Sequence, residues 1–208
     1  MPHTILHIDS SPMGGRSISR KLGAKVLAEL QARFPSSTLK TRDLAAEPLP
    51  HLSAQTLGAY FTPAEQRTPE LDAAAALSDA AIAELKAADV VVIGAPMWNF
   101  GIPSVLKAWI DHVVRAGHTF KYGANGPEGL LDAGKKVIIV SSRGGVYTAG
   151  PMSAFDFQED YLRSVFHFIG LRDVSFVRAE GVAMGEDAVK AAMQAAEGHL
   201  AQAVQALA

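Results

Sequence analysis

The amino-acid sequence predicts an α/β fold: a doubly wound, five-stranded parallel sheet with helices on both faces. Three observations lead to this prediction. Short runs rich in β-branched residues alternate along the chain with stretches whose apolar residues recur every three or four positions, as amphipathic helices require. Residues 90–93 and 137–140 are apolar at every position, which is typical of strands covered by helices on both sides. No repeat or linker divides the chain, so we expect residues 1–208 to form a single domain.

Five segments are expected to form the strands, because each is short and rich in residues that favour extended backbone. They are residues 4–8, 38–43, 90–94, 137–140 and 174–177. Four other stretches carry one apolar stripe each and are expected to form helices. These are residues 18–34, 71–85, 104–111 and 189–207. Trp109 falls within the third of them and is expected to pack in the core.

Two stretches interrupt this alternation. Residues 48–69 contain four prolines and are expected to be the main irregular excursion. Residues 116–132 mix Phe120 and Tyr122 with several glycines. The glycines allow tight turns, and the aromatic side chains indicate that this projection covers a neighbouring surface.

Composition excludes several classes of protein. The chain has 19 Lys and Arg against 21 Asp and Glu, so its formal net charge of -2 offers no electrostatic footprint for nucleic acid or an anionic membrane. The chain has no cysteine, which excludes disulfides, Fe–S clusters, thiolate zinc sites and a cysteine nucleophile. Its seven histidines show no metal-ligand spacing, so no metal is expected. No apolar run approaches the roughly 18 residues of a membrane helix, and a cytoplasmic protein is expected.

The loop after the first predicted strand, residues 9–20, combines hydroxyl side chains, two glycines and Arg16 just before a helix. The free N–H groups and positive dipole end of that helix form a phosphate site, and a monophosphate would suit it. The loop lacks the glycine patterns of dinucleotide folds and of P-loops. Spacing alone leaves an alternative open, in which Ser17 merely caps the helix and Arg16 is solvated.

The loop after the third predicted strand displays large side chains between two prolines. Pro96 and Pro103 bracket Met97, Trp98, Asn99 and Phe100, so the loop is stiff and would suit a flat aromatic ligand. The alternative is that Trp98 and Phe100 lie in the core, the commoner fate of aromatic residues.

The loop after the fourth predicted strand contains Arg143, Gly144 and Gly145. Adjacent glycines let main-chain N–H groups approach a ligand closely, while Arg143 can offer a positive charge or hold the loop in place. A plain turn is the alternative for this loop taken alone. The first, third and fourth strands, however, end together at the switch point of a doubly wound sheet, so we expect the three loops to form one site.

Three groups of residues resemble a known family. They are Ser10 with Ser17, Ile18 and Ser19; the run from Pro96 to Lys107; and Ser142, Arg143, Gly144 and Gly145. Together they resemble the flavodoxin-like, FMN-dependent NADH:quinone oxidoreductases and azoreductases, and the match runs along essentially the whole chain. The resemblance implies that the first group holds the FMN phosphate, that Pro96, Met97, Trp98, Asn99 and Phe100 lie along the isoalloxazine ring, and that the third group contacts the edge of this ring.

The resemblance also implies an activity. FMN would carry the redox chemistry without a catalytic side chain, accepting hydride from NADH and reducing quinones or cleaving aromatic azo compounds by a ping-pong mechanism. Members of the family are homodimers with the FMN sites at the interface. Trp98 stands where the family has Tyr, which affects pocket width, and Phe120 and Tyr122 are the candidate substrate contacts.

Two other functions share this fold and cofactor. One is a flavodoxin-like electron carrier that passes single electrons to a protein partner; the other is a flavin reductase that releases its product. The near-neutral charge of this chain favours the enzyme over the carrier, because flavodoxins tend to be acidic.

Overall fold

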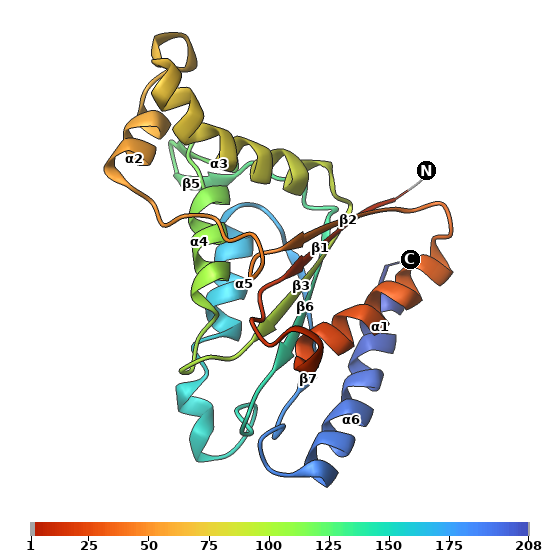
Figure 1. The fold of residues 1–208 in the computed structure, drawn as a ribbon. Helices are drawn as coiled ribbons and strands as arrows, with labels where there is room; N and C mark the ends of the chain where they lie inside the picture. Colours follow the sequence, from red (N-terminus) through yellow and green to blue (C-terminus); the bar gives the residue numbers. More distant parts are fainter. Residues whose placement is uncertain (1–2, 208) are drawn as a thin grey trace.

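The computed structural model describes residues 3–207 and contains the predicted sheet. Five parallel strands lie in the order β2-β1-β3-β6-β7 (Figure 1). They are β1 (Thr4–Asp9), β2 (Thr38–Asp43), β3 (Val90–Pro96), β6 (Lys136–Ser142) and β7 (Asp173–Ala179). The chain runs outward in one direction from β1 to β2 and in the other from β3 to β7. The topological switch point therefore lies between β1 and β3.

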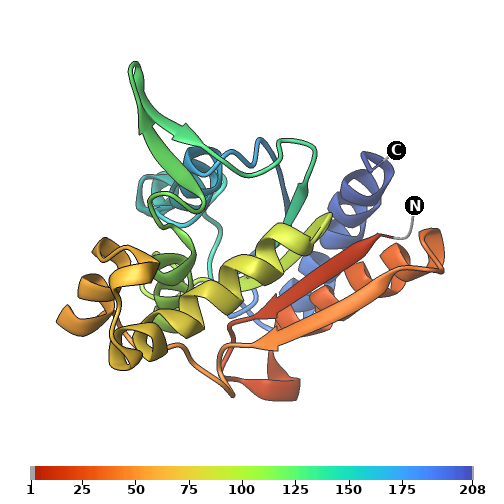
Figure 2. The same ribbon diagram turned by 90° about the horizontal axis from the view of Figure 1, so that it is seen from above.

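Helices cover both faces of the sheet, as predicted, and a separate hydrophobic cluster lies under each layer. On one face pack α3 (Pro69–Ala87), α4 (Ser104–Val113) and α5 (Glu159–Phe168); on the other pack α1 (Ile18–Arg33) and α6 (Glu186–Gln205) (Figures 1 and 2). Val91 and Ile93 belong to the first cluster, and Val90 and Val92 to the second. This alternation explains why β3 is apolar at every position. Trp109 is fully buried in the first cluster, which confirms its packing role.

Residues 48–69 are less irregular than expected. They contain the helix α2 (Ala54–Phe61) and a 3-10 turn at Ala64–Gln66, labelled η2. Ser53 caps α2 by accepting the Thr56 N–H at 3.1 Å. The four prolines all lie outside α2, so none of them interrupts its hydrogen bonds. The prediction of an irregular stretch was therefore wrong for the middle of this segment.

Residues 116–132 project from the body of the molecule as paired strands (Figure 2). Strands β4 (Phe120–Gly123) and β5 (Gly126–Gly129) form an antiparallel hairpin, where the sequence predicted a projection rich in turns. Gly126 has a φ of 114°, a conformation that favours glycine, and it lets the chain reverse between the strands. None of the helices between residues 3 and 207 combines the length and apolar character that a bilayer crossing needs.

Candidate functional site

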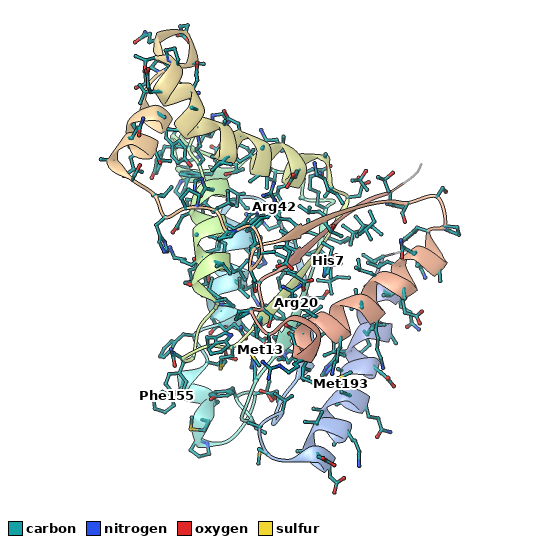
Figure 3. The ribbon with its side chains drawn as sticks, viewed as in Figure 1. His7, Met13, Arg20, Arg42, Phe155 and Met193 are labelled. Atoms are coloured by element: carbon teal, nitrogen blue, oxygen red, sulfur yellow. The ribbon has the colours of Figure 1, made fainter. Side chains whose placement is uncertain are left out.

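The three loops singled out in the sequence meet at one edge of the sheet. In the sheet register Asp9 pairs with Gly94, and Pro96 pairs with Ser142, so β1, β3 and β6 end side by side. The Met97 N–H donates to the Ser142 carbonyl at 2.8 Å and joins the second loop to the third. Met13 of the first loop lies at the same end of the molecule (Figure 3).

The first loop enters α1 through a cluster of buried hydroxyl groups. Ser17 caps the helix by accepting the Arg20 N–H at 3.3 Å, and its hydroxyl oxygen lies 3.0 Å from that of Ser19. The N–H groups of Ile18 and Ser19 lie in the first turn and have no acceptor within the helix. Arg16 is exposed beside them. The start of α1 therefore combines both features: Ser17 caps the helix, and free N–H donors and the Arg16 cation lie beside the cap.

Ser10 has a different position within the same loop. Its buried hydroxyl donates to the Gly94 carbonyl at 2.6 Å and thereby ties the end of β1 to β3. The proton of this hydroxyl is therefore already engaged, and Ser10 offers an oxygen lone pair to a ligand unless that bond is exchanged.

Arg20, which the sequence reasoning missed, braces the first loop (Figure 3). Its guanidinium donates to the Ser11 carbonyl at 2.8 and 3.1 Å, to Asp9 at 3.2 Å and to Asp43 at 2.7 Å. The hydrogen bond to Asp43 raises the pKa of Arg20, and the same bond lowers the pKa of Asp43. A cation in the first turn of a helix opposes the helix dipole, so an arginine at this position implies acidic partners. The position of Arg20 in the sequence therefore indicates an ion pair, although it does not identify Asp9 and Asp43 as the partners.

The second loop makes a tight reversal with unusual backbone angles. Trp98 and Gly101 exchange two backbone hydrogen bonds of 3.0 Å, and between them Asn99 and Phe100 have φ angles of 47° and 69°. A phenylalanine with positive φ is rare because of steric strain, and such strain is concentrated at functional sites. The side chains of Trp98 and Phe100 are 46% and 39% exposed. This exposure rules out the alternative that these aromatic residues belong to the core.

The third loop is held by its arginine. The Arg143 side chain is fully buried and donates to Asp156 at 2.8 Å, Glu159 at 2.6 Å and Glu180 at 3.3 Å. Of the two roles considered for Arg143, the structure therefore shows that the side chain holds the loop in place. The guanidinium is buried and paired with carboxylates, so it does not face a ligand.

In the backbone of the third loop, three carbonyl groups are hydrogen-bonded within residues 3–207 and three N–H groups are not. The carbonyls of Arg143, Gly144 and Gly145 accept N–H groups from the segment 181–183 at 2.9 to 3.1 Å. The N–H groups of Gly144, Gly145 and Val146 have no partner in the described part of the chain. The loop thus presents three successive free donors, an arrangement that binds acceptor atoms.

A groove lies between the first two loops. Its volume is about 670 Å³, within the range of small-molecule sites. Apolar side chains, Ser10, Asn99 and Lys107 line it, and Trp98 forms one wall. A flat ligand held by the three loops could reach this groove.

Phe120 and Tyr122 do not join this site within one chain. The hairpin follows the C-terminal end of α4, whereas the second loop precedes its N-terminal end (Figure 1). Phe120 packs against Phe168, and Tyr122 is 77% exposed. Both border a separate cavity of about 230 Å³ beside α2.

Comparison with known proteins agrees with this architecture. A family model described as flavodoxin-like fold matches residues 3–204. An FMN-dependent NADH:quinone oxidoreductase of Herminiimonas arsenicoxydans is 56% identical over 189 residues, covering 91% of this chain and 92% of that protein. The protein of the same name from Nostoc sp. is 50% identical over 201 residues, covering 96% and 97%.

The chain belongs to the family of FMN-dependent NADH:quinone oxidoreductases. This confirms the resemblance noted in the sequence, including its extent along the chain. Solved structures of similar proteins agree with the family's fold. An azoreductase from Bacillus anthracis str. Sterne superimposes with a TM-score of 0.87 at 30% identity, covering 100% of this chain and 99% of that one. An FMN-dependent NADH-azoreductase from Bacillus anthracis str. Ames Ancestor, solved in complex with FMN, gives 0.89 at 27% identity, with 99% coverage of both chains.

Proposed function

We propose that this protein binds FMN at the three loops and, with NADH as electron donor, reduces quinones by two electrons and reductively cleaves aromatic azo compounds. The proposal rests on the meeting of three features at one edge of the sheet. They are a helix start that can bind phosphate, a loop with exposed aromatic side chains, and a row of free N–H groups. The names of the relatives support it. FMN, when bound, supplies the two-electron chemistry.

The residues of this chain fit FMN. The free N–H groups at the start of α1, with Ser17, Ile18, Ser19 and nearby Arg16, would hold the phosphate. Ser10 would join them by turning its hydroxyl proton from the Gly94 carbonyl to a phosphate oxygen. The second loop, from Pro96 to Phe100, would lie along the ring. In the third loop, Ser142, Arg143, Gly144 and Gly145 would meet the edge of the ring through the backbone, because the Arg143 side chain is committed to carboxylates.

Each part of the site would perform a separate task. The N–H groups of Gly144 and Gly145 would stabilise the negative charge that develops on the edge of the ring during reduction. The apolar groove beside Trp98 would hold first the nicotinamide and then the acceptor, and exclude water from both. Because both substrates would use one groove, the protein needs no separate dinucleotide motif.

We propose a homodimer with the FMN sites at its interface. The cavity beside α2 carries an apolar patch in which Phe61 is 82% exposed, next to Leu57 and Tyr122. The loops at the other end of α4 also leave Trp98, Phe155 and Phe157 exposed. A two-fold axis would let the patch of each subunit cover the loops of the other, which brings Phe120 and Tyr122 to the partner's groove. NADH is an intracellular metabolite, so we place the activity in the cytoplasm.

The test is an assay of the purified protein with NADH or NADPH as donor and menadione or methyl red as acceptor. We expect about one FMN per chain, retained through gel filtration, and NADH-dependent reduction of both acceptors. Release of the flavin on the column would favour the flavin reductase. Protein that is colourless and binds no added FMN would overturn the proposal.

A further inference from the structure

A buried ionic network lies beneath the third loop. Arg143, at the end of β6, contacts Asp156, Glu159 and Glu180. Glu159 in turn accepts two hydrogen bonds from Arg178 of β7, at 2.6 and 2.7 Å. The network therefore joins the ends of two strands to the start of α5.

Glu180 is the member of this network that accepts hydrogen bonds from the backbone of the third loop. Its Oε1 atom accepts the Tyr147 N–H at 2.8 Å and the Thr148 N–H at 3.1 Å, and its Oε2 atom accepts the Thr148 hydroxyl. Burial alone would raise the pKa of Glu180, but the hydrogen bonds from Thr148 and Tyr147 and the charge of Arg143 outweigh burial and lower it. Glu180 is therefore ionised at neutral pH and binds the far end of the loop as a carboxylate.

The contacts of Glu180 and of segment 181–183 engage the backbone of the third loop from one side. The segment 181–183 binds the carbonyls of Arg143, Gly144 and Gly145, and Glu180 binds the N–H groups of Tyr147 and Thr148. Within the third loop, the N–H groups of Gly144, Gly145 and Val146 have no partner among residues 3–207. Glu180 and the next three residues therefore hold the loop from one side and leave those donors available on the other.

We propose that Glu180 is a positioning residue, which sets the direction in which the N–H groups of Gly144, Gly145 and Val146 meet the edge of the bound flavin ring. This inference rests on the proposed function. Glu180 needs no contact with the flavin to act in this way, because it works through the loop backbone. Arg143 lies 3.3 Å from Glu180 and offsets part of the charge of this carboxylate.

Two substitutions separate geometry from charge. Glu180→Asp keeps the negative charge but is one methylene shorter, so it cannot hold both Arg143 and the loop. Glu180→Gln keeps the length and can still accept hydrogen bonds, but removes the charge. The control is Glu197→Asp, since Glu197 forms an exposed ion pair with Lys25 far from the loops.

Binding is measured by titrating flavin-free protein with FMN and with riboflavin. We expect Glu180→Asp to weaken both ligands about tenfold, because the loop meets the ring and not the phosphate. We also expect the two-electron potential of the bound flavin to fall by about 30 mV, which corresponds to a tenfold weaker preference for the reduced ring. Hydrogen exchange of the flavin-free protein should show loss of protection at the Tyr147 and Thr148 amides in this variant, and no change in Glu197→Asp.

The outcomes distinguish the possible roles. A charge effect alone would leave Glu180→Asp like the wild type and raise the flavin potential in Glu180→Gln. A purely structural role would lower the unfolding midpoint of Glu180→Asp without changing flavin affinity or potential in the folded protein. Either result overturns the inference. Failure of the wild type to bind FMN would instead overturn the proposed function, while the exchange data would still show whether Glu180 holds the loop.

Discussion

The hydroxyl oxygens of Ser17 and Ser19 lie 3.0 Å apart in the first turn of α1, beside the free N–H groups of that turn. The same Ser17 oxygen caps the helix. The Ser17 hydroxyl would therefore serve both as helix cap and as phosphate ligand, and a substitution can test the two roles separately.

We predict that Ser17→Asp will weaken FMN at least tenfold. Aspartate is as good a cap as serine, so the helix should persist. The new carboxylate would face the phosphate, and like charges about 4 Å apart in a partly buried site repel by a few kcal/mol. A tenfold loss corresponds to about 1.4 kcal/mol, and fluorescence-quenching titration of flavin-free protein measures it.

Riboflavin is the control for this variant, because it has no phosphate and should lose much less affinity. Circular dichroism confirms that the fold is retained. Equal losses for both ligands, or no loss for either, would show that the phosphate lies elsewhere. This pattern also differs from that of Glu180→Asp, which should weaken both ligands equally.

A second prediction concerns stability. Arg143→Met should destabilise the protein by about 3–5 kcal/mol, since it leaves buried carboxylates without their partner. Lys25→Met breaks an exposed pair with Glu197 and should cost at most about 1 kcal/mol. Urea unfolding curves of the two variants provide the comparison. Similar midpoints would mean that the buried network contributes no more than a surface pair.

A third prediction concerns the kinetic order. If one groove serves both substrates, double-reciprocal plots against NADH at several quinone concentrations should be parallel, because the oxidised nicotinamide leaves before the quinone binds. Intersecting lines would indicate a ternary complex, and with it two separate binding places.

A fourth prediction concerns assembly. Light scattering of a dilute solution should report twice the chain mass of 22.0 kDa. Tyr122→Ser, on the proposed contact surface, should shift the protein toward monomer and lower its activity together. A fully active monomer would contradict the proposal that the FMN site lies at a dimer interface.

A fifth prediction concerns the acceptor. Trp98→Ala should raise the KM for menadione roughly two- to tenfold, as expected from loss of about 0.5–1.5 kcal/mol of aromatic contact. Because Trp98 is half exposed and its backbone bonds remain, the unfolding midpoint should change little. An unchanged KM would show that quinones bind away from this wall of the groove.

Much of the fold and the place of the site could be predicted from the sequence, because both depend on short-range patterns. The apolar run of β3 and the spacing in α1 identify a buried strand and an amphipathic helix without knowledge of their neighbours. In a doubly wound sheet with right-handed crossovers, the first, third and fourth strands then end together at the switch point, which places the three loops at one site.

The roles of individual side chains depended on contacts between distant parts of the chain. Arg143 could have faced a ligand or held its loop, and the carboxylates that decide this lie 13 to 37 positions further along the chain. Glu180 lies in a segment that resembles the family, but its role is decided by its contacts with Tyr147 and Thr148, which precede it by 33 and 32 positions. Phe120 and Tyr122 are residue types that often line pockets, yet they lie beyond the C-terminal end of α4, whereas the second loop precedes its N-terminal end. The apolar periodicity of a segment indicates which of its faces is buried. Ion pairs and pocket walls form only when the packed elements bring separate segments together.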